Sequence, residues 1–515
     1  MNKMIKKLLS IVLFAGMIGN QHLNAQVRQS NEMAYQVKDQ AFNHSRIEEI
    51  AQFMTDRLGP RLAASQMKTR AERLVMEKLD SLGLKGSHKE FAWDFKKGGW
   101  DNKRNYVAMT SPYYCSFAAN PKAWSGSTQG LVKGECIILE VADTADIKKY
   151  EGKLKGKIVL MPERSKYELS FRPMASRYTD EQLQEMTKDT RPYDPWGSWS
   201  SRGGRNNLLM QVIDSLIKVE KPLAVVVGDG TFNIPGSRGV DYKVGDSEPI
   251  TEIVLPIEDH GRMVRLVKSG ELVEMEIDIE NKFTDNQSIN NIIVEIPGTD
   301  PKLKNEVVLI GAHLDSWHGG TGGADNASGC ITMIEAMRIL KSLDIKPRRT
   351  IRLALWGGEE QGLYGSRGYA KNYLYDSENK IVKGGYDDFA LYLNMDFGSG
   401  RFKGVYLEEN DMALPFFEAW KAPLVSLGFD TFSPRKVGST DHVSFSRLGL
   451  PAYQFIQDPL DYFRTYHTTM DTYERLSLDD LKVNAAIVAW LAYSAAMDDR
   501  HIPVKPGYPL VLNKE

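Results

Sequence analysis

Hydrophobic residues recur along the chain with two different periods. Residues 45–84 carry apolar side chains three and four positions apart, a spacing that predicts amphipathic helices. Between about residues 134 and 283 the apolar residues fall in short runs such as ECIILEVA and PLAVVVGDG, which predict β-strands. A long polar stretch at 164–221 interrupts these runs, and its pattern is compatible with either a lid or a disordered segment.

After residue 286 near-continuous apolar runs alternate with helical patterns. The four runs are EVVLI, TIRLALW, FALYLNM and PAYQFI. Strands that are apolar throughout are typical of a mainly parallel sheet covered by helices on both faces, so we predict an α/β fold for this part of the chain. Ligands of such sheets bind beyond the carboxyl ends of the strands, and candidate chemistry is expected there.

Length and charge narrow the picture further. A chain of 515 residues exceeds what one hydrophobic core usually supports, so two folded units are expected. The formal net charge is −2, which gives no electrostatic reason to expect nucleic acid or an anionic membrane as a partner. The sequence leaves the oligomeric state open, a homodimer included.

The N-terminus is typical of a secretory signal peptide. Residues 1–25 combine lysines, a short apolar stretch and a small-residue end at Ala25. The apolar stretch is too short for an ordinary membrane span, and no later stretch is long enough. We therefore expect a secreted or periplasmic protein, with a retained N-terminal anchor as the alternative.

Three cysteines are too few for a disulfide framework. A single bridge between Cys115 and Cys136 would be allowed in an exported protein. Cys330 lies among apolar residues at helical spacing, which predicts a small buried core residue.

Carboxylates and imidazoles follow each of the four apolar runs. They are His313 and Asp315 after the first run, Glu359 and Glu360 after the second, Asp396 after the third and His467 beyond the fourth, with Asp325 at the start of the helix after the first run. Each alone has an ordinary explanation, such as a helix cap or a solvated surface position. Together they form a ligand set that suits zinc.

A pair of metal ions at this edge would suit hydrolysis. One aspartate can bridge two ions, which together polarise a carbonyl and lower the pKa of a shared water. Of the adjacent Glu359 and Glu360, one can bind metal while the other acts as a general base. Asp315 can hydrogen-bond the second ring nitrogen of His313. The glycines of the GGTGG segment allow the loop to bring Asp325 back toward His313.

Five motifs in this region resemble those of the co-catalytic two-zinc exopeptidases, a family that includes secreted zinc aminopeptidases, plasma glutamate carboxypeptidase and glutamate carboxypeptidase II. They are GAHLDSW, GGADNASG, WGGEEQGLYGS, NMDFG and YHTTMDT, in this order between residues 311 and 472. The resemblance implies two zinc ions. One would be bound by His313 and Asp396, the other by Glu360 and His467, and Asp325 would bridge them.

The same resemblance implies roles for residues beside the metal ions. Glu359 would be the general base, and Asp315 would be the hydrogen-bond partner of His313. The segment GSTDHVSF is similar to a family segment near the pocket. Asp441 and His442 are therefore candidates for contacts with the ligands or the substrate.

The β-rich segment resembles the protease-associated domain that this family often inserts into its catalytic domain. The implied organisation is a signal peptide at 1–25, the first part of the catalytic domain at 26–111, the insert at 112–285, the main catalytic part at 286–505 and a tail at 506–515. The polar stretch at 164–221 matches no part of the family pattern.

The resemblance implies hydrolysis of a terminal peptide bond in a peptide substrate, and an aminopeptidase is the preferred interpretation. Carboxypeptidase or dipeptidase activity is the alternative, because metal-ligand motifs do not say which terminus is held. A noncatalytic receptor-like binding protein would have the same architecture, but the complete set of ligands and base argues against it.

Overall fold

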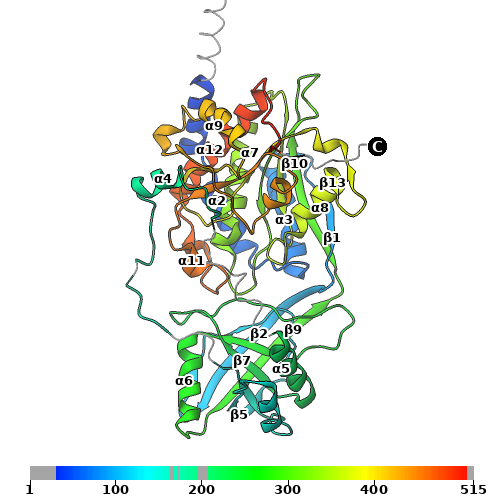
Figure 1. Cartoon of the computed structure of the whole chain (residues 1–515), viewed down its shortest axis with the longest axis vertical. Coiled ribbons are helices and arrows are strands. Elements are labelled where there is room, and N and C mark those ends of the chain that lie inside the picture. Colours follow the sequence, from blue (N-terminus) through cyan, green and yellow to red (C-terminus); the bar gives the residue numbers. More distant parts are fainter. Residues whose placement is uncertain (1–30, 163–166, 172, 194–206, 507, 509–515) are drawn as a thin grey trace, which may run out of the picture.

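The computed structural model describes residues 31–162, 167–171, 173–193, 207–506 and 508. The expected signal peptide and most of the expected tail lie outside this range. Two eight-stranded sheets organise the chain, one in the upper and one in the lower part of Figure 1.

The first sheet has the strand order β1-β10-β12-β11-β15-β18-β16-β17. The strands are β1 (His88–Asp94), β10 (Ser288–Ile296), β11 (Val307–His313), β12 (Thr350–Trp356), β15 (Phe389–Asn394), β16 (Phe402–Tyr406), β17 (Thr431–Ser433) and β18 (Ala452–Gln457). The central strands β12, β11, β15 and β18 are parallel, whereas β10 and β16 flank them in antiparallel orientation. The predicted α/β class is confirmed, as a mixed sheet with a parallel centre.

Helices cover both faces of this sheet. The helices α2 (Ile47–Gln52), α3 (Gln66–Ser81), α7 (Ser328–Ser342) and α12 (Leu478–Met497) pack on one face, and α8 (Tyr364–Tyr373) and α10 (Val443–Ser446) pack on the other. Strand β11 is buried on both sides, with Val308 and Ile310 in the first core and Leu309 in the second. Alternate side chains of one strand point to opposite faces, so a strand between two helical layers must be apolar throughout.

The second sheet has the order β3-β2-β9-β5-β6-β7-β8-β4. Its strands are β2 (Gly99–Ser111), β3 (Cys115–Ser116), β4 (Asn120–Pro121), β5 (Val132–Ile138), β6 (Ile158–Leu160), β7 (Ala224–Gly228), β8 (Glu252–Leu255) and β9 (Glu274–Thr284). Helices α5 (Asn207–Glu220) and α6 (Ile257–Lys268) pack against it in two separate apolar clusters.

The boundary between the two sheets differs from the predicted one at residue 111. Strand β2 pairs with β9 from Gly99 to Ser111 and so belongs to the second sheet. Strand β1 pairs with β10 in the first sheet. The chain therefore passes between the sheets within residues 94–99, and it returns after Thr284.

Part of the polar stretch at 164–221 is an ordered segment that returns to the first sheet. It contains α4 (Asp180–Met186), which lies beside the upper part of the molecule in Figure 1 and contacts β17. Ser176 and Leu460 exchange two backbone hydrogen bonds of 3.0 and 2.9 Å. The Arg177 guanidinium donates to Asp458 at 2.8 Å. This segment therefore connects the two parts of the molecule.

All three cysteines are free, so the allowed bridge between Cys115 and Cys136 is not formed. Cys330 is fully buried in the first core, as predicted. Within the described ranges, no helix has the length and apolar character needed to cross a membrane.

Candidate metal centre

The predicted ligands meet at one edge of the first sheet. His313 is the last residue of β11, Glu359 and Glu360 follow β12, Asp396 follows β15, and His467 follows the short helix α11 (Tyr462–Thr465) beyond β18. Because these strands are parallel neighbours, their carboxyl ends lie side by side. The topology thus brings together residues that are far apart in the sequence.

The ligand atoms form two groups, and within each group they lie no more than 4.8 Å apart. One group contains His313, Glu359 and Asp396, and the other contains Asp325, Glu360 and His467. Each group offers imidazole nitrogen and carboxylate oxygen, a combination that suits Zn²⁺.

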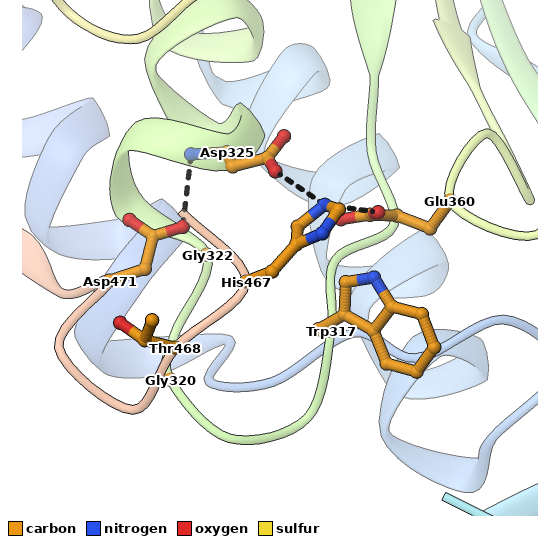
Figure 2. A pocket seen from close by; sticks show the side chains of 8 residues that line it. All are labelled: Trp317, Gly320, Gly322, Asp325, Glu360, His467, Thr468 and Asp471. Carbon is orange, nitrogen blue, oxygen red and sulfur yellow. Dashed lines mark hydrogen bonds and ion pairs between the residues drawn. The ribbon is translucent and has the colours of Figure 1, made fainter. Parts of the chain in front are cut away.

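Asp325 connects the two groups. Its Oδ1 lies 3.2 Å from Nε2 of His313, and its Oδ2 lies 3.1 Å from Nε2 of His467. Figure 2 shows the second contact and, on the other side of His467, the carboxylate of Glu360 at 2.9 Å. A carboxylate that bridges two metal ions needs one oxygen on the side of each ion. Asp325 has this arrangement.

Burial and crowded charge shift the pKa values of these residues. Burial alone would lower the pKa of His467, but the charges and hydrogen bonds of Glu360 and Asp325 raise it to about 10. Burial raises the pKa of Glu360 to about 7. For Glu359, burial and the neighbouring charges of Asp396 and Asp441 raise the pKa well above its usual range.

The hydrogen bonding of the candidate ligands, as well as their residue types, fits a bound metal ion. Glu360 Oε1 is buried, and no hydrogen-bond donor reaches it from the described residues. A buried carboxylate oxygen without a partner is costly, and a divalent cation beside it would remove that cost.

Asp315 acts differently from its prediction. His313 donates from Nδ1 to the backbone carbonyl of Asp315 at 3.0 Å, whereas the Asp315 carboxylate is 3.8 Å from that nitrogen. The carboxylate instead accepts hydrogen bonds from the backbone N–H groups of Glu359 at 3.1 Å and Glu360 at 3.3 Å. The chain turns after His313, so the carbonyl fixes the ring and leaves Nε2 for metal, while the side chain fixes the loop after β12.

Asp441 and His442 lie in the same region and are both fully buried. Burial raises the pKa of Asp441 to about 7, and the charges of Asp396 and Asp315 add to the shift. His442 Nε2 lies 3.0 Å from Oε1 of the buried Glu408. His442 is thus engaged with Glu408 instead of joining either ligand group.

Arg61 binds the loop between His313 and Asp325, and sequence reasoning missed it. Its buried guanidinium donates to the backbone carbonyls of Leu314 at 2.7 Å, Thr321 at 2.6 Å and Gly322 at 3.1 Å. These carbonyls belong to the connection between His313 and Asp325. No pattern links a residue near the N-terminus to this loop, so the sequence offered no signal for it.

Asp471 is a second residue that sequence reasoning missed. Its carboxylate accepts hydrogen bonds from the backbone N–H groups of Ala324 at 2.6 Å and Asp325 at 3.1 Å, one of which Figure 2 shows. Burial and the charge of Asp325 raise its pKa to about 8. Asp471 lies within the quoted motif YHTTMDT, so a signal was present in the sequence.

Comparison with known families identifies one part of the chain. Residues 291–492 match the model of Peptidase family M28. This part of the chain belongs to that family. All six residues of the two ligand groups lie within the matched range, and the family resemblance inferred from the five motifs is confirmed. The match supports a metallopeptidase.

The similarity to individual relatives extends beyond the segment that matches family M28 and covers most of the chain. Carboxypeptidase Q of Rattus norvegicus is 24% identical over 453 residues, which cover 87% of this chain and 85% of that protein. A Peptidase M28 precursor from Shewanella amazonensis has a similar structure, with a TM-score of 0.66, 23% identity and coverage of 93% and 99% of the two chains. A zinc aminopeptidase from Bacillus subtilis gives a TM-score of 0.52, 19% identity and coverage of 89% and 97%. The solved structures support the fold. The names of these relatives include both a carboxypeptidase and an aminopeptidase.

Proposed function

We propose that the protein is a zinc-dependent exopeptidase that uses two zinc ions to hydrolyse a terminal peptide bond. The observation that carries this proposal is the position of the Asp325 carboxylate between the two ligand groups. In the assignment that we propose, His313 and Asp396 bind one ion, Glu360 and His467 bind the other, and Asp325 bridges them. Bound there, the ions would polarise the scissile carbonyl and lower the pKa of the attacking water.

Glu359 is proposed as the general base. Its carboxylate lies 4.0 Å from Nε2 of His313, farther than the Asp396 carboxylate at 3.1 Å. Its raised pKa, caused by burial and nearby negative charge, makes it a stronger proton acceptor than an exposed glutamate. It takes a proton from the water and passes it to the leaving amine.

The charge around the site favours an aminopeptidase. Carboxylates surround the ligand groups, and Asp315, Asp441 and Asp471 are all buried there. The buried Arg61 directs its guanidinium to backbone carbonyls and does not offer it to a substrate carboxylate. Carboxylate oxygens accept hydrogen bonds from an α-amino group, whereas an α-carboxylate needs donors.

A carboxypeptidase or dipeptidase is the second candidate, because the likeness to Carboxypeptidase Q spans most of both chains. A panel of matched peptides with free and blocked termini distinguishes the two polarities. Cleavage of N-terminally free peptides alone supports an aminopeptidase, and cleavage of N-terminally blocked peptides from the C-terminus supports a carboxypeptidase.

The setting of the enzyme completes the proposal. The signal pattern at residues 1–25 supports a secreted or periplasmic protein. The second sheet, which lies between two segments of the first-sheet unit, supports the interpretation as an inserted protease-associated domain. A peptide is the partner that this assignment requires.

A further inference from the structure

A loop of the second part of the molecule pairs directly with the chain at His467. The backbone N–H of Ser237 donates to the carbonyl of His467 at 2.6 Å, and the N–H of Thr469 donates to the carbonyl of Pro235 at 3.2 Å. Gly236 and Thr468 form an antiparallel bridge between these two bonds. In Figure 1, α11, which directly precedes His467, lies on the side of the upper part that faces the second sheet.

His467 needs such support because of its backbone conformation. Its φ angle is +53°, in the left-handed region that residues with a Cβ atom rarely adopt. A residue in this region keeps its conformation only when the surrounding structure fixes it. The hydrogen bond from Ser237 acts on the carbonyl of this same residue and so holds the backbone from which its imidazole projects.

The pairing loop is itself held by a buried asparagine. Asn120, which begins β4, donates from Nδ2 to the carbonyl of Gly236 at 3.1 Å and to the hydroxyl of Ser237 at 3.0 Å. Asn120 is 4% exposed and Ser237 is fully buried. Solvent therefore does not compete for these bonds, which tie the loop to β4 of the second sheet.

The loop between His313 and Asp325 also contacts Ser237 and Asn120. A Cβ atom on Gly319 would lie 2.3 Å from Oγ of Ser237 and 2.7 Å from Nδ2 of Asn120, so only glycine fits there. The next residue back, His318, donates from Nε2 to the carbonyl of Pro121 at 2.7 Å. The loop that leads to Asp325 and the loop that carries His467 thus both contact one small surface of the second part.

We propose that residues 235–237, fixed by Asn120, position His467 for metal binding, so that the second part of the chain is a component of the metal centre. We call residues 235–237 together with Asn120 the insert clamp. This inference rests on the proposed function, because it requires His467 to bind a metal ion. Loss of groups that orient a metal ligand commonly weakens metal binding about 10- to 100-fold.

Two substitutions remove the insert clamp in different ways. Asn120→Ala deletes the side chain that fixes the loop, and Ser237→Pro deletes the N–H group that bonds to His467. Asn105→Ala is the matched control, because Asn105 also belongs to the second part and also donates from its amide to a backbone carbonyl, that of Ala119, at 2.7 Å.

The experiment titrates zinc against a chromogenic chelator with the metal-free, full-length protein of each variant, and it also records the melting temperature. The His467→Ala variant identifies the affinity that belongs to the ion at His467. We expect Asn120→Ala and Ser237→Pro to weaken that affinity about 10- to 100-fold while the other affinity changes little. The Asn105→Ala control should not lower it, and the melting temperatures show whether a loss of affinity follows general destabilisation.

Two results would overturn the inference. The first is unchanged zinc affinity in both clamp variants of a protein whose wild type binds two ions, which leaves the proposed function intact. The second is an equal loss at both ions that follows the melting temperature, because this indicates general destabilisation. A wild-type protein that binds no zinc would instead contradict the proposed function itself.

Discussion

Asp325 Oδ2 lies 3.1 Å from Nε2 of His467, and the other oxygen of the same carboxylate faces His313. One side chain of the second ligand group therefore also lies against the first. Asp325→Ala should reduce tightly bound zinc at both positions, from about two ions to less than one per chain. Inductively coupled plasma mass spectrometry of the purified protein measures this, with the exposed Asp344→Ala as control. Wild-type zinc content in Asp325→Ala would show that this residue does not bridge.

Glu359→Gln should remove the general base while the metal ligands stay in place. The amide cannot accept the proton, so kcat should fall about 10²- to 10⁴-fold while the zinc content stays at the wild-type level. Steady-state kinetics and metal analysis of the same sample test this. Glu359 lies close to His313 and Asp396, so a loss of one zinc ion in this variant would assign it as a ligand instead.

Arg61 should contribute to stability through the ligand loop. Arg61→Met leaves several buried carbonyls without a donor, and the free energy of unfolding should fall by about 3 kcal/mol or more. Arg61→Lys keeps the charge and part of the donors, so its loss should be smaller. Urea denaturation of the metal-free protein measures both variants. Equal stability of Arg61→Met and wild type would contradict the role that we assign to this residue.

Arg177 should hold the segment around α4 against the first sheet. Its guanidinium bonds to Asp458 at 2.8 Å and to Asp480 at 2.7 Å, and both carboxylates are buried. Arg177→Ala should increase the rate of limited proteolysis within residues 173–193 several-fold, because local opening exposes the backbone there. The neighbouring exposed Arg191 provides the control variant Arg191→Ala. Identical cleavage rates in the two variants would exclude this anchoring role.

The centre of the fold and the meeting of the candidate ligands at one sheet edge were predictable from local patterns. Apolar runs such as TIRLALW identify strands buried on both faces, and the rule for parallel sheets places Glu359 and Asp396 at the same edge. The predicted boundary at residue 111 coincides with the end of β2, a strand of the second sheet. The glycine pair before Trp100 was the better turn signal, since the chain leaves the first sheet there.

The contacts that fix the site were not predictable in this way. Arg61 and Ser237 act on the ligand loops through backbone groups, so neither the residue type nor the spacing identifies their partners. The hydrogen bond of His313 to the backbone of Asp315 has the same character. Main-chain hydrogen bonds over long sequence distances depend on the packed structure and leave little trace in one sequence.

The central claim is that two zinc ions at this site carry out the hydrolysis of a terminal peptide bond. The most direct test adds zinc stepwise to the chelator-treated protein and records the initial rate with a free N-terminal peptide substrate. We predict that the rate is negligible without metal and reaches its plateau at about two equivalents of zinc per chain. Activity that survives complete removal of metal, or no activity at any zinc concentration with any terminal peptide, would contradict the account.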